Sequence, residues 1–462
     1  MDTQLLSPPD TSKAPSLDNI RMDSGALELG PVISYDDVRY TFSTSIMIPA
    51  LPQIMLEFAV SRVTAPLTLT IYTIGLAFGP LFIASFSELF GRRWIYVTTS
   101  GAFVIFTGCC TAAPNFASLL VLRFCTGFSG SAVLAIGAGT IADVWGLSTS
   151  GAYAGLLFIL GPFLGPTLGP LAGAYVMGSH SDWRWTLYTA LILGSVLFVA
   201  TVLMSETSKN WILRNDPAYQ NKIDLSAENI GALLRKALLK PTRMLFTDSV
   251  VSVLAFYSAY VYALVFSYFA STSYILQRFY SFTLKEVGLS FLSVIIGYLL
   301  ATIMFGVFTR IGERKATQES VSMHNEHRLM SACVGSLLLP AGLFWYAWEA
   351  HAGGRWAALV AAGIVFGCGA FSIFLSIIIY QVEFFGADSG ASAIAANGML
   401  SYTMGAVFPL FTVQMYQKLG VHWAGSTFAF LAVAMIPIPF ILFKFGPRLR
   451  QRSKFTPDVF EK

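Results

Sequence analysis

Long apolar runs separated by short polar segments follow one another along most of the chain. A helix needs about 20 residues to cross a hydrocarbon core of ~30 Å. We predict a membrane-spanning helix for each run: 40–56, 65–84, 94–112, 117–140, 151–177, 185–205, 249–270, 287–308, 328–348, 356–380, 394–417 and 423–444. The pattern therefore predicts an all-α integral membrane protein with twelve transmembrane helices.

The first run is shorter than the others. As a helix this run would be ~25 Å long, which is shorter than the membrane core is thick. Three charged residues, Asp36, Asp37 and Arg39, lie just before it. Either this helix is short or the sequence lacks an opening segment. Residues 1–39 are polar, rich in Ser, Asp and Pro, and hold no apolar core for a signal peptide. We predict a disordered cytoplasmic tail there.

The spans divide evenly around the polar, basic stretch 206–245. This arrangement predicts two six-helix lobes, 40–205 and 246–445, joined by a central cytoplasmic loop. Most of the 29 Lys and Arg fall in the segments on one side of the predicted membrane. The positive-inside bias places both termini in the cytoplasm, with a basic carboxyl tail, 446–462, against anionic lipid.

Composition agrees with a membrane protein and excludes several kinds of site. The chain is 55% hydrophobic and 12% charged, whereas a soluble chain carries about 25% charged residues. Its five cysteines lie in apolar runs without metal-ligand spacing. We find no phosphate-binding loop, hydrolase pattern or nucleic-acid-binding pattern. We therefore expect no enzyme activity, cofactor, metal or nucleic-acid partner, and a monomer in the lipid bilayer.

The run GPFLGPTLGPLAG, 161–173, has glycines at every fourth position, each of the first three followed by a proline. On a helix the glycines form one bare stripe against which another helix can pack closely, and we expect that neighbour to be the span with Gly288 and Gly297. Interior prolines remove backbone hydrogen bonds and allow kinks. The stripe predicts either a kinked packing helix or a bendable gate helix, and comprises Gly161, Pro162, Gly165, Pro166, Gly169, Pro170 and Gly173.

A tight turn follows the second span, where Glu88, Gly91, Arg92 and Arg93 place a carboxylate and two guanidiniums together. Such a turn can pair with a neighbouring helix end in one conformation and release it in another, although paired arginines also serve as topology anchors. We interpret it as an inner-gate loop.

Arg123 is the one charge well inside a predicted span. A buried cation in a membrane is costly and marks a functional site unless backbone carbonyls merely cap it. Among the carboxylates near span ends, Asp143 and Glu383 at predicted cytoplasmic ends are the better candidates for proton coupling. The alternative is that each only caps a helix end at the membrane interface.

Hydroxyl-bearing aromatic and amide side chains suggest a substrate cavity. Tyr257 and Tyr260 share a helical face, and Asn397, Ser401 and Tyr402 could add contacts from another span. Few fixed charges accompany them. We therefore expect a neutral or amphiphilic organic solute.

An ordered set of motifs resembles the major facilitator superfamily, and especially the fungal twelve-span drug:proton antiporters, which include polyamine and toxin exporters. The motifs are SELFGRR (87–93), LRFCTGFSGSA (122–132), GPFLGPTLGPLAG, ASAIAAN (391–397) and FPLFTVQMY (408–416). Departures from that group are Ser85 in place of Pro, Ser401 in place of Arg, a missing basic residue after span 4 and the short first span. They bear on the details of coupling.

The resemblance implies a secondary active transporter of the plasma or vacuolar membrane that exports a drug, toxin or secondary metabolite in exchange for protons. Arg123 would take part in coupling, and Glu88, Arg92 and Arg93 would hold the inner gate closed. An uptake permease or uniporter for a small metabolite remains the alternative, and a non-transporting membrane sensor a further one.

Overall fold

The computed structural model describes residues 30–145, 149–208, 211–212, 238–319, 325–351, 354–453 and 455. Within these residues all regular structure is helical. Most of the predicted tail and of the central loop 206–245 lies outside them, as do residues 456–462.

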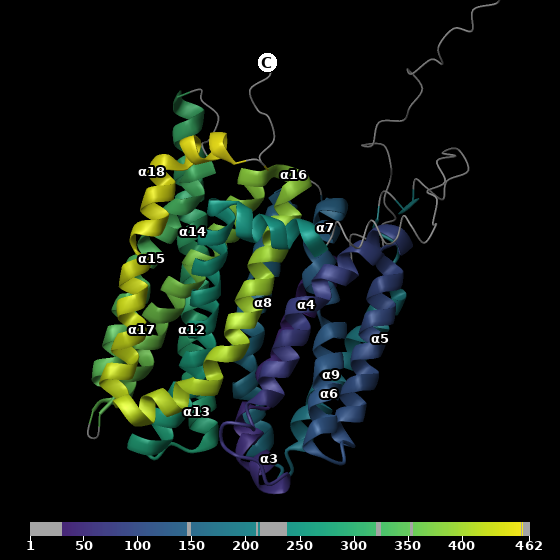
Figure 1. Ribbon diagram of the computed structural model, residues 1–462, viewed down its shortest axis with the longest axis vertical. Coiled ribbons are helices and arrows are strands. Elements are labelled where there is room, and N and C mark those ends of the chain that lie inside the picture. Colours follow the sequence, from purple (N-terminus) through teal and green to yellow (C-terminus); the bar gives the residue numbers. More distant parts are fainter. Residues whose placement is uncertain are drawn as a thin grey trace, which may run out of the picture.

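Two helical lobes stand side by side (Figure 1). The amino-terminal lobe contains α2 (Gly30–Ser45), η3 (Ile48–Ala50), α3 (Leu51–Glu57), α4 (Leu67–Phe90), α5 (Arg92–Thr111), α6 (Phe116–Gly130), α7 (Ala132–Trp145), α8 (Thr149–Met177) and α9 (Arg184–Leu203). The carboxy-terminal lobe contains α12 (Ser249–Phe279), α13 (Leu284–Ser290), α14 (Leu292–Glu319), η4 (Asn325–Leu329), α15 (Met330–Glu349), α16 (Trp356–Leu419), α17 (Val421–Met435) and α18 (Pro437–Arg452).

Eleven segments of the described chain are long and apolar enough to cross a membrane. The remaining predicted span, the first, is the broken segment α2–η3–α3. Its long helix ends at Ser45, and prolines follow at the starts of η3 and α3. Proline is tolerated at a helix start but not in its interior, which accounts for the break.

The start of the first helix was predicted too late. The first helix begins at Gly30, ten residues before the predicted start, and runs through Asp36, Asp37 and Arg39. The segment is therefore not short. At the other end, α18 continues to Arg452, into the stretch predicted to be a cytoplasmic tail.

Glycines with positive φ make two of the sharp corners between spans. Gly91 has a φ of 85° between α4 and α5, and Gly386 has a φ of 66° inside α16. L side chains rarely adopt this backbone conformation. The corner at Gly386 divides α16 into two antiparallel arms, which correspond to the two predicted spans 356–380 and 394–417.

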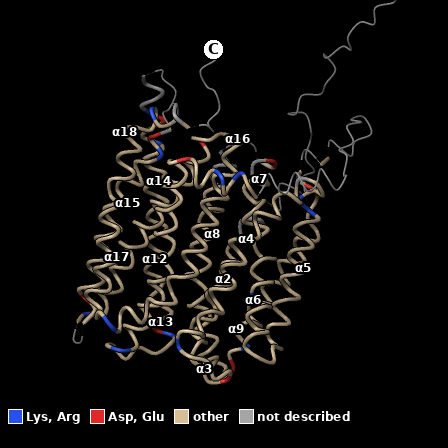
Figure 2. Tube along the Cα trace, viewed as in Figure 1, with Lys and Arg blue, Asp and Glu red and all other residues tan. Residues whose placement is uncertain are grey.

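The outer helices carry apolar side chains on their exposed faces. On α9 these are Ile192, Val196, Val199 and Leu203, spaced to form one stripe. These side chains have no polar group that would need a hydrogen-bond partner, so the stripe is suited to contact with lipid. By contrast, most of α12 is buried. Charged residues lie mainly at the two ends of the described backbone, with few between them (Figure 2).

The two ends of the molecule differ in what they hold. We call the end where α2 starts and α18 finishes the termini end, and the opposite end, with α3 and α13, the distal end (Figure 1). The corners at Gly91 and Gly386 lie at the termini end.

Candidate functional site

A pocket of about 460 Å³ lies between the lobes at the distal end. The amino-terminal lobe contributes η3, α3, the start of α4 and the distal part of α8, and the carboxy-terminal lobe contributes α12, α13 and α16. Ligand pockets of small organic molecules have volumes of about 300–1,000 Å³. The pocket is therefore large enough for such a molecule.

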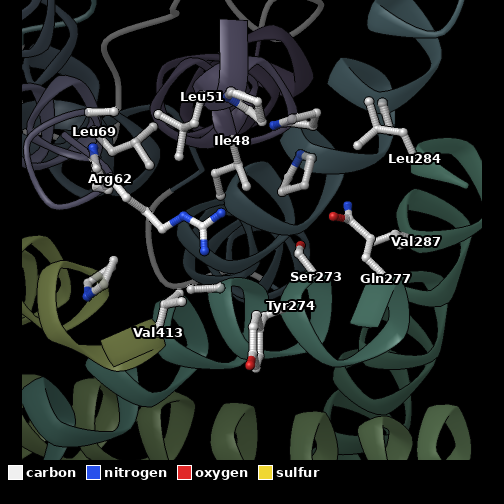
Figure 3. Close-up of a pocket in the computed structure, with 18 of the residues that line it drawn as sticks. Ile48, Leu51, Arg62, Leu69, Ser273, Tyr274, Gln277, Leu284, Val287 and Val413 are labelled. Atoms are coloured by element: carbon white, nitrogen blue, oxygen red, sulfur yellow. The ribbon is translucent and has the colours of Figure 1, made fainter. Parts of the chain in front are cut away.

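Most of the pocket wall is apolar, with residues such as Leu69, Val287 and Phe291. Its neutral hydrogen-bonding side chains are Ser273, Tyr274, Gln277 and Gln414. In Figure 3 the Arg62 side chain extends into the pocket, between the wall that carries Ile48 and Leu51 and the wall that carries Val413 and Tyr274. The lining suits an amphiphilic organic molecule.

An aromatic cluster joins the lobes on the termini side of this pocket. Phe163 of α8 is fully buried and packs edge-on against four rings of the carboxy-terminal lobe, with centroid distances between 4.7 and 5.6 Å. The rings belong to Tyr262, Tyr298, Phe371 and Phe374. Phe163 lies seven residues before Pro170 of the pocket, or about 10 Å along the helix. We call these five rings the aromatic seal.

Two hydrogen bonds reinforce the aromatic seal. The hydroxyl of Tyr262 donates to the carbonyl of Pro162 at 3.2 Å, and the hydroxyl of Thr167 donates to that of Tyr298 at 3.4 Å. Both bonds cross from one lobe to the other. The path from the pocket towards the termini end is therefore packed with side chains at this level.

At the termini end, Arg92 connects α5 to α7 within the amino-terminal lobe. Its guanidinium forms an ion pair with Asp143 of α7 at 2.7 Å and donates to Thr140 Oγ1 and to the carbonyl of Ile136. The prediction that this turn pairs with a neighbouring helix end is compatible with this contact. Arg93 donates to the carbonyl of Val202 in α9. The Glu88 side chain lies outside the described part of the structure.

Glu206, which is not among the site residues predicted from the sequence, also takes part in this turn. Its carboxylate accepts the backbone N–H groups of Arg92 at 2.9 Å and Arg93 at 3.2 Å, at the start of α5. These amides have no partner within their own helix, so the carboxylate acts as a helix cap supplied from beyond α9. Two features of the sequence could have indicated this cap. A carboxylate comes directly after span 6, and the turn before span 3 has no capping side chain of its own.

The carboxy-terminal lobe contains a matching ion pair. Arg328, just before α15, donates to Glu383 at 3.0 Å and to Thr309 Oγ1 at 3.2 Å. Each pair joins the start of the third span of a lobe to the end of its fourth. Asp143 and Glu383 therefore occupy equivalent places in the two lobes.

Arg123 is completely buried in α6 and is held by backbone oxygens. It donates to the carbonyls of Ser43 at 2.9 Å, Thr44 at 3.4 Å and Thr68 at 3.2 Å, and its guanidinium lies 4.2 Å from the ring centre of Tyr72. Its Nη1 atom has no hydrogen-bond partner in the structure. The residue thus connects α6 to α2 and α4.

Comparison with known proteins identifies the architecture. The family model of the Major Facilitator Superfamily matches residues 40–409. The chain belongs to this superfamily. The similar proteins that belong to this superfamily are transporters, so the chain is a membrane transporter rather than an enzyme.

Several fungal transporters of the superfamily are similar along most of the chain. "Efflux pump FUBT" of Fusarium oxysporum is 34% identical over 91% of this chain and 72% of its own length. "MFS-type transporter traF" of Penicillium crustosum is 35% identical over 90% and 86%, respectively. The solved structure of the human organic anion transporter MFSD10 covers 90% of the chain, with a TM-score of 0.64 and 15% identity. At this identity, the similarity to MFSD10 shows the fold alone.

The glycine stripe of this superfamily member packs within its own lobe. A Cβ atom added at Gly165 would lie 2.6 Å from the backbone of Phe42, and one at Gly169 2.8 Å from the same residue's carbonyl oxygen. Thr41 also donates to the carbonyl of Gly161. We expected the stripe to face the span with Gly288 and Gly297, and that expectation is wrong. The stripe packs against α2, whereas the opposite side of α8 contacts α13 through Leu171 and Ala174.

The five residues predicted to line a cavity are absent from the distal pocket. Tyr260 donates to the carbonyl of Phe428, and Asn397 donates to Ser258 and Gln381 and accepts from Ser401. The side chain of Tyr257 is buried in the same lobe. Tyr402 packs on Tyr262 of the aromatic seal, with ring centres 5.2 Å apart.

Metal chemistry has no site in the described part of this transporter. No group of three His, Cys, Asp or Glu side chains there could hold an ion. The five cysteines are free thiols.

Proposed function

We propose that this transporter exports a small organic compound, such as a drug, toxin or secondary metabolite, in exchange for protons. The observation that carries the proposal is the pocket between the lobes at the distal end, separated from the termini end by the aromatic seal. A site reached from one end and packed at the other fits one state of an alternating-access cycle. Relatives named as efflux pumps support the direction of transport.

The positive-inside bias supports an orientation with the termini end in the cytoplasm. In that orientation the distal pocket faces the outside, and the structure corresponds to a state that releases an exported compound. The plasma membrane, or the vacuolar membrane, would be the site of action. The opposite state would need the lobes to separate around Phe163 and to close over the pocket.

Two arginine–carboxylate pairs supply the coupling in this proposal. Asp143 with Arg92, and Glu383 with Arg328, hold helix ends together at the termini end. A carboxylate that loses its guanidinium partner binds a proton more readily. Each pair lies within one lobe, so a shift of helix ends inside a lobe that separates the pair during the cycle would favour protonation, and return of the pair would favour release. Arg123 would transmit the movement of α6 to α2 and α4.

The test is transport in proteoliposomes with an imposed pH gradient. The fluorescent probe phenylnaphthylamine is loaded, and its movement is followed with and without the gradient. We expect proton influx to stimulate movement of the probe in the opposite direction. An uptake permease coupled to protons would move it in the same direction, and a uniporter would ignore the gradient. Either result would refute the antiport proposal.

A further inference from the structure

Arg62 stands out because it is the one charged side chain among the residues that line the distal pocket. It belongs to the connection between α3 and α4. Hydrogen bonds hold that connection: Ser61 Oγ lies 2.7 Å from Thr64 Oγ1, and the N–H groups of Thr64 and Ala65 each donate to the Ser61 carbonyl at 3.0 Å. The backbone that carries Arg62 is therefore fixed, while its side chain extends into the pocket (Figure 3).

The carboxylates at the distal end are committed to other partners. Glu57 pairs with Arg184 at 2.6 Å, Asp182 with the same guanidinium at 3.4 Å, and Glu286 caps α13 through Thr283. The pocket lining includes no Asp or Glu. Arg62 takes part in none of the ion pairs of the described residues. Its guanidinium is thus available to a ligand.

We propose that the distal pocket selects amphiphilic organic anions and that Arg62 binds their carboxylate or sulfonate group. The planar guanidinium offers paired N–H donors that match the two oxygens of such a group. The apolar walls would hold the body of the molecule, and Gln277 and Gln414 could donate further hydrogen bonds. This inference rests on the proposed function, because it takes the distal pocket as the releasing side of the transport path.

A matched pair of fluorescent probes tests the inference. Anilinonaphthalene sulfonate is an amphiphilic anion, and phenylnaphthylamine has the same ring skeleton without the sulfonate. Binding of each is titrated on the full chain in nanodiscs of neutral lipid, after subtraction of empty nanodiscs. We expect Arg62→Ala to weaken binding of the sulfonate by about tenfold. Binding of the neutral probe should stay within about twofold, because its contacts are apolar.

Two further variants separate a local contact from other effects. Lys418→Ala removes the same charge from an exposed position at the distal end of α16, outside the pocket, and should leave the binding of both probes unchanged. Arg62→Lys keeps the charge without the paired donors and should recover part of the affinity for the sulfonate. Unchanged thermal unfolding of each variant checks that it is folded.

Three results would overturn the inference: no saturable binding of the sulfonate to the wild type, an equal loss in Lys418→Ala, or an equal loss of both probes in Arg62→Ala. These outcomes are distinct from failure of the proposed function. Binding that depends on Arg62 without any response to a pH gradient would refute antiport and leave the anion site standing. Gradient-driven transport of phenylnaphthylamine, together with unchanged binding of the sulfonate in Arg62→Ala, would support antiport and refute the anion site.

Discussion

At the scale of single residues, Arg123 shows how a charge can be kept inside a membrane lobe. Its surroundings are carbonyl oxygens of α2 and α4 and the face of Tyr72. The carbonyls of Ser43 and Thr44 belong to the last turn of α2, where backbone acceptors lack helical partners. The buried guanidinium thus satisfies the end of one helix while it fixes the position of another.

We expect Arg123→Ala to reduce transport by at least about tenfold, because the carbonyls of α2 and α4 would lose a shared donor in a dry interior. Arg123→Lys should retain only part of the activity, because one ammonium group cannot reach both helices with the same geometry. The measurement is efflux of phenylnaphthylamine from cells, divided by the amount of protein at the surface. Normal efflux per molecule in Arg123→Ala would remove this residue from the mechanism.

Asp143 and Glu383 permit a matched test of proton coupling, because each pairs with an arginine at an equivalent place in its lobe. Asparagine or glutamine at these positions keeps the shape and removes the titrating group. We expect Asp143→Asn, Glu383→Gln or both to abolish stimulation by a pH gradient while leaving probe binding intact. Proteoliposome transport with and without the gradient gives the answer. If both variants and the double variant respond to the gradient like the wild type, neither carboxylate carries the proton.

At the scale of elements, the close approach of α8 and α2 defines the amino-terminal lobe. Gly165 and Gly169 bring the two backbones together, and Gly173 does the same at Ile46. Close backbone packing of this kind is a principal source of stability between helices in lipid. Pro166 has no N–H to donate to the carbonyl of Pro162, which accepts from Tyr262 instead, and Thr41 donates to the neighbouring carbonyl of Gly161.

We expect Gly165→Leu to abolish transport, because the added side chain would meet Thr41 and the backbone of Phe42. Gly155 lies in the same helix with nothing within 4 Å of an added Cβ, so Gly155→Leu is the control and should transport nearly normally. Efflux and thermal unfolding of both variants should be compared. Normal behaviour of Gly165→Leu would show that the two helices do not pack as described.

Glu57 connects α3 to the start of α9. It accepts from Arg184 and, at 2.6 Å, from the indole of Trp183. The hydrogen bond from Arg184 lowers the pKa of the Glu57 carboxyl from its ordinary value of 4.5. A lowered pKa stabilises the folded lobe above pH 4.5, and this contribution is lost as the pH falls through the lowered value.

We therefore expect Glu57→Gln to lower the unfolding temperature at neutral pH by about 1–3 °C, a small effect because the pair is partly exposed. The difference from the wild type should shrink below pH 4.5. Asp182→Asn, whose carboxylate is farther from Arg184, should have a smaller effect. Thermal unfolding across this pH range checks both. A difference that grows with acidification would contradict the assignment.

At the scale of the whole molecule, the spacing of apolar runs was enough to predict an all-α membrane fold, because a bilayer forces nearly every spanning segment to be helical. The family came from the resemblance of the motifs. The start of α2 was missed because Asp36, Asp37 and Arg39 are unfavourable in an apolar span, yet Arg39 is buried and donates to the carbonyl of Gly194. A tertiary contact of this kind leaves no trace in the hydropathy pattern.

The candidate site was harder to predict from the sequence. A glycine stripe shows which face of a helix packs closely but not which helix lies against it, and α8 has neighbours on both sides. Tyr257 and Tyr260 share a face, but α12 is buried on most sides, so periodicity does not indicate the face that borders a pocket. Arg62 lies outside any periodic segment. Its position in the pocket depends on how the lobes meet.

Movement of the lobes in opposite senses at the two ends is the central claim of the account. Spin labels at Leu56 and Leu419 report on the distal end, and labels at Leu203 and Phe246 on the termini end; all four side chains are exposed. The two distances are measured in nanodiscs on variants with the native cysteines replaced by serine, at neutral and mildly acidic pH, with and without saturating phenylnaphthylamine. The account predicts that the distal distance shortens whenever the termini-end distance lengthens. Distances that change together, or that respond to neither protons nor probe, would contradict it.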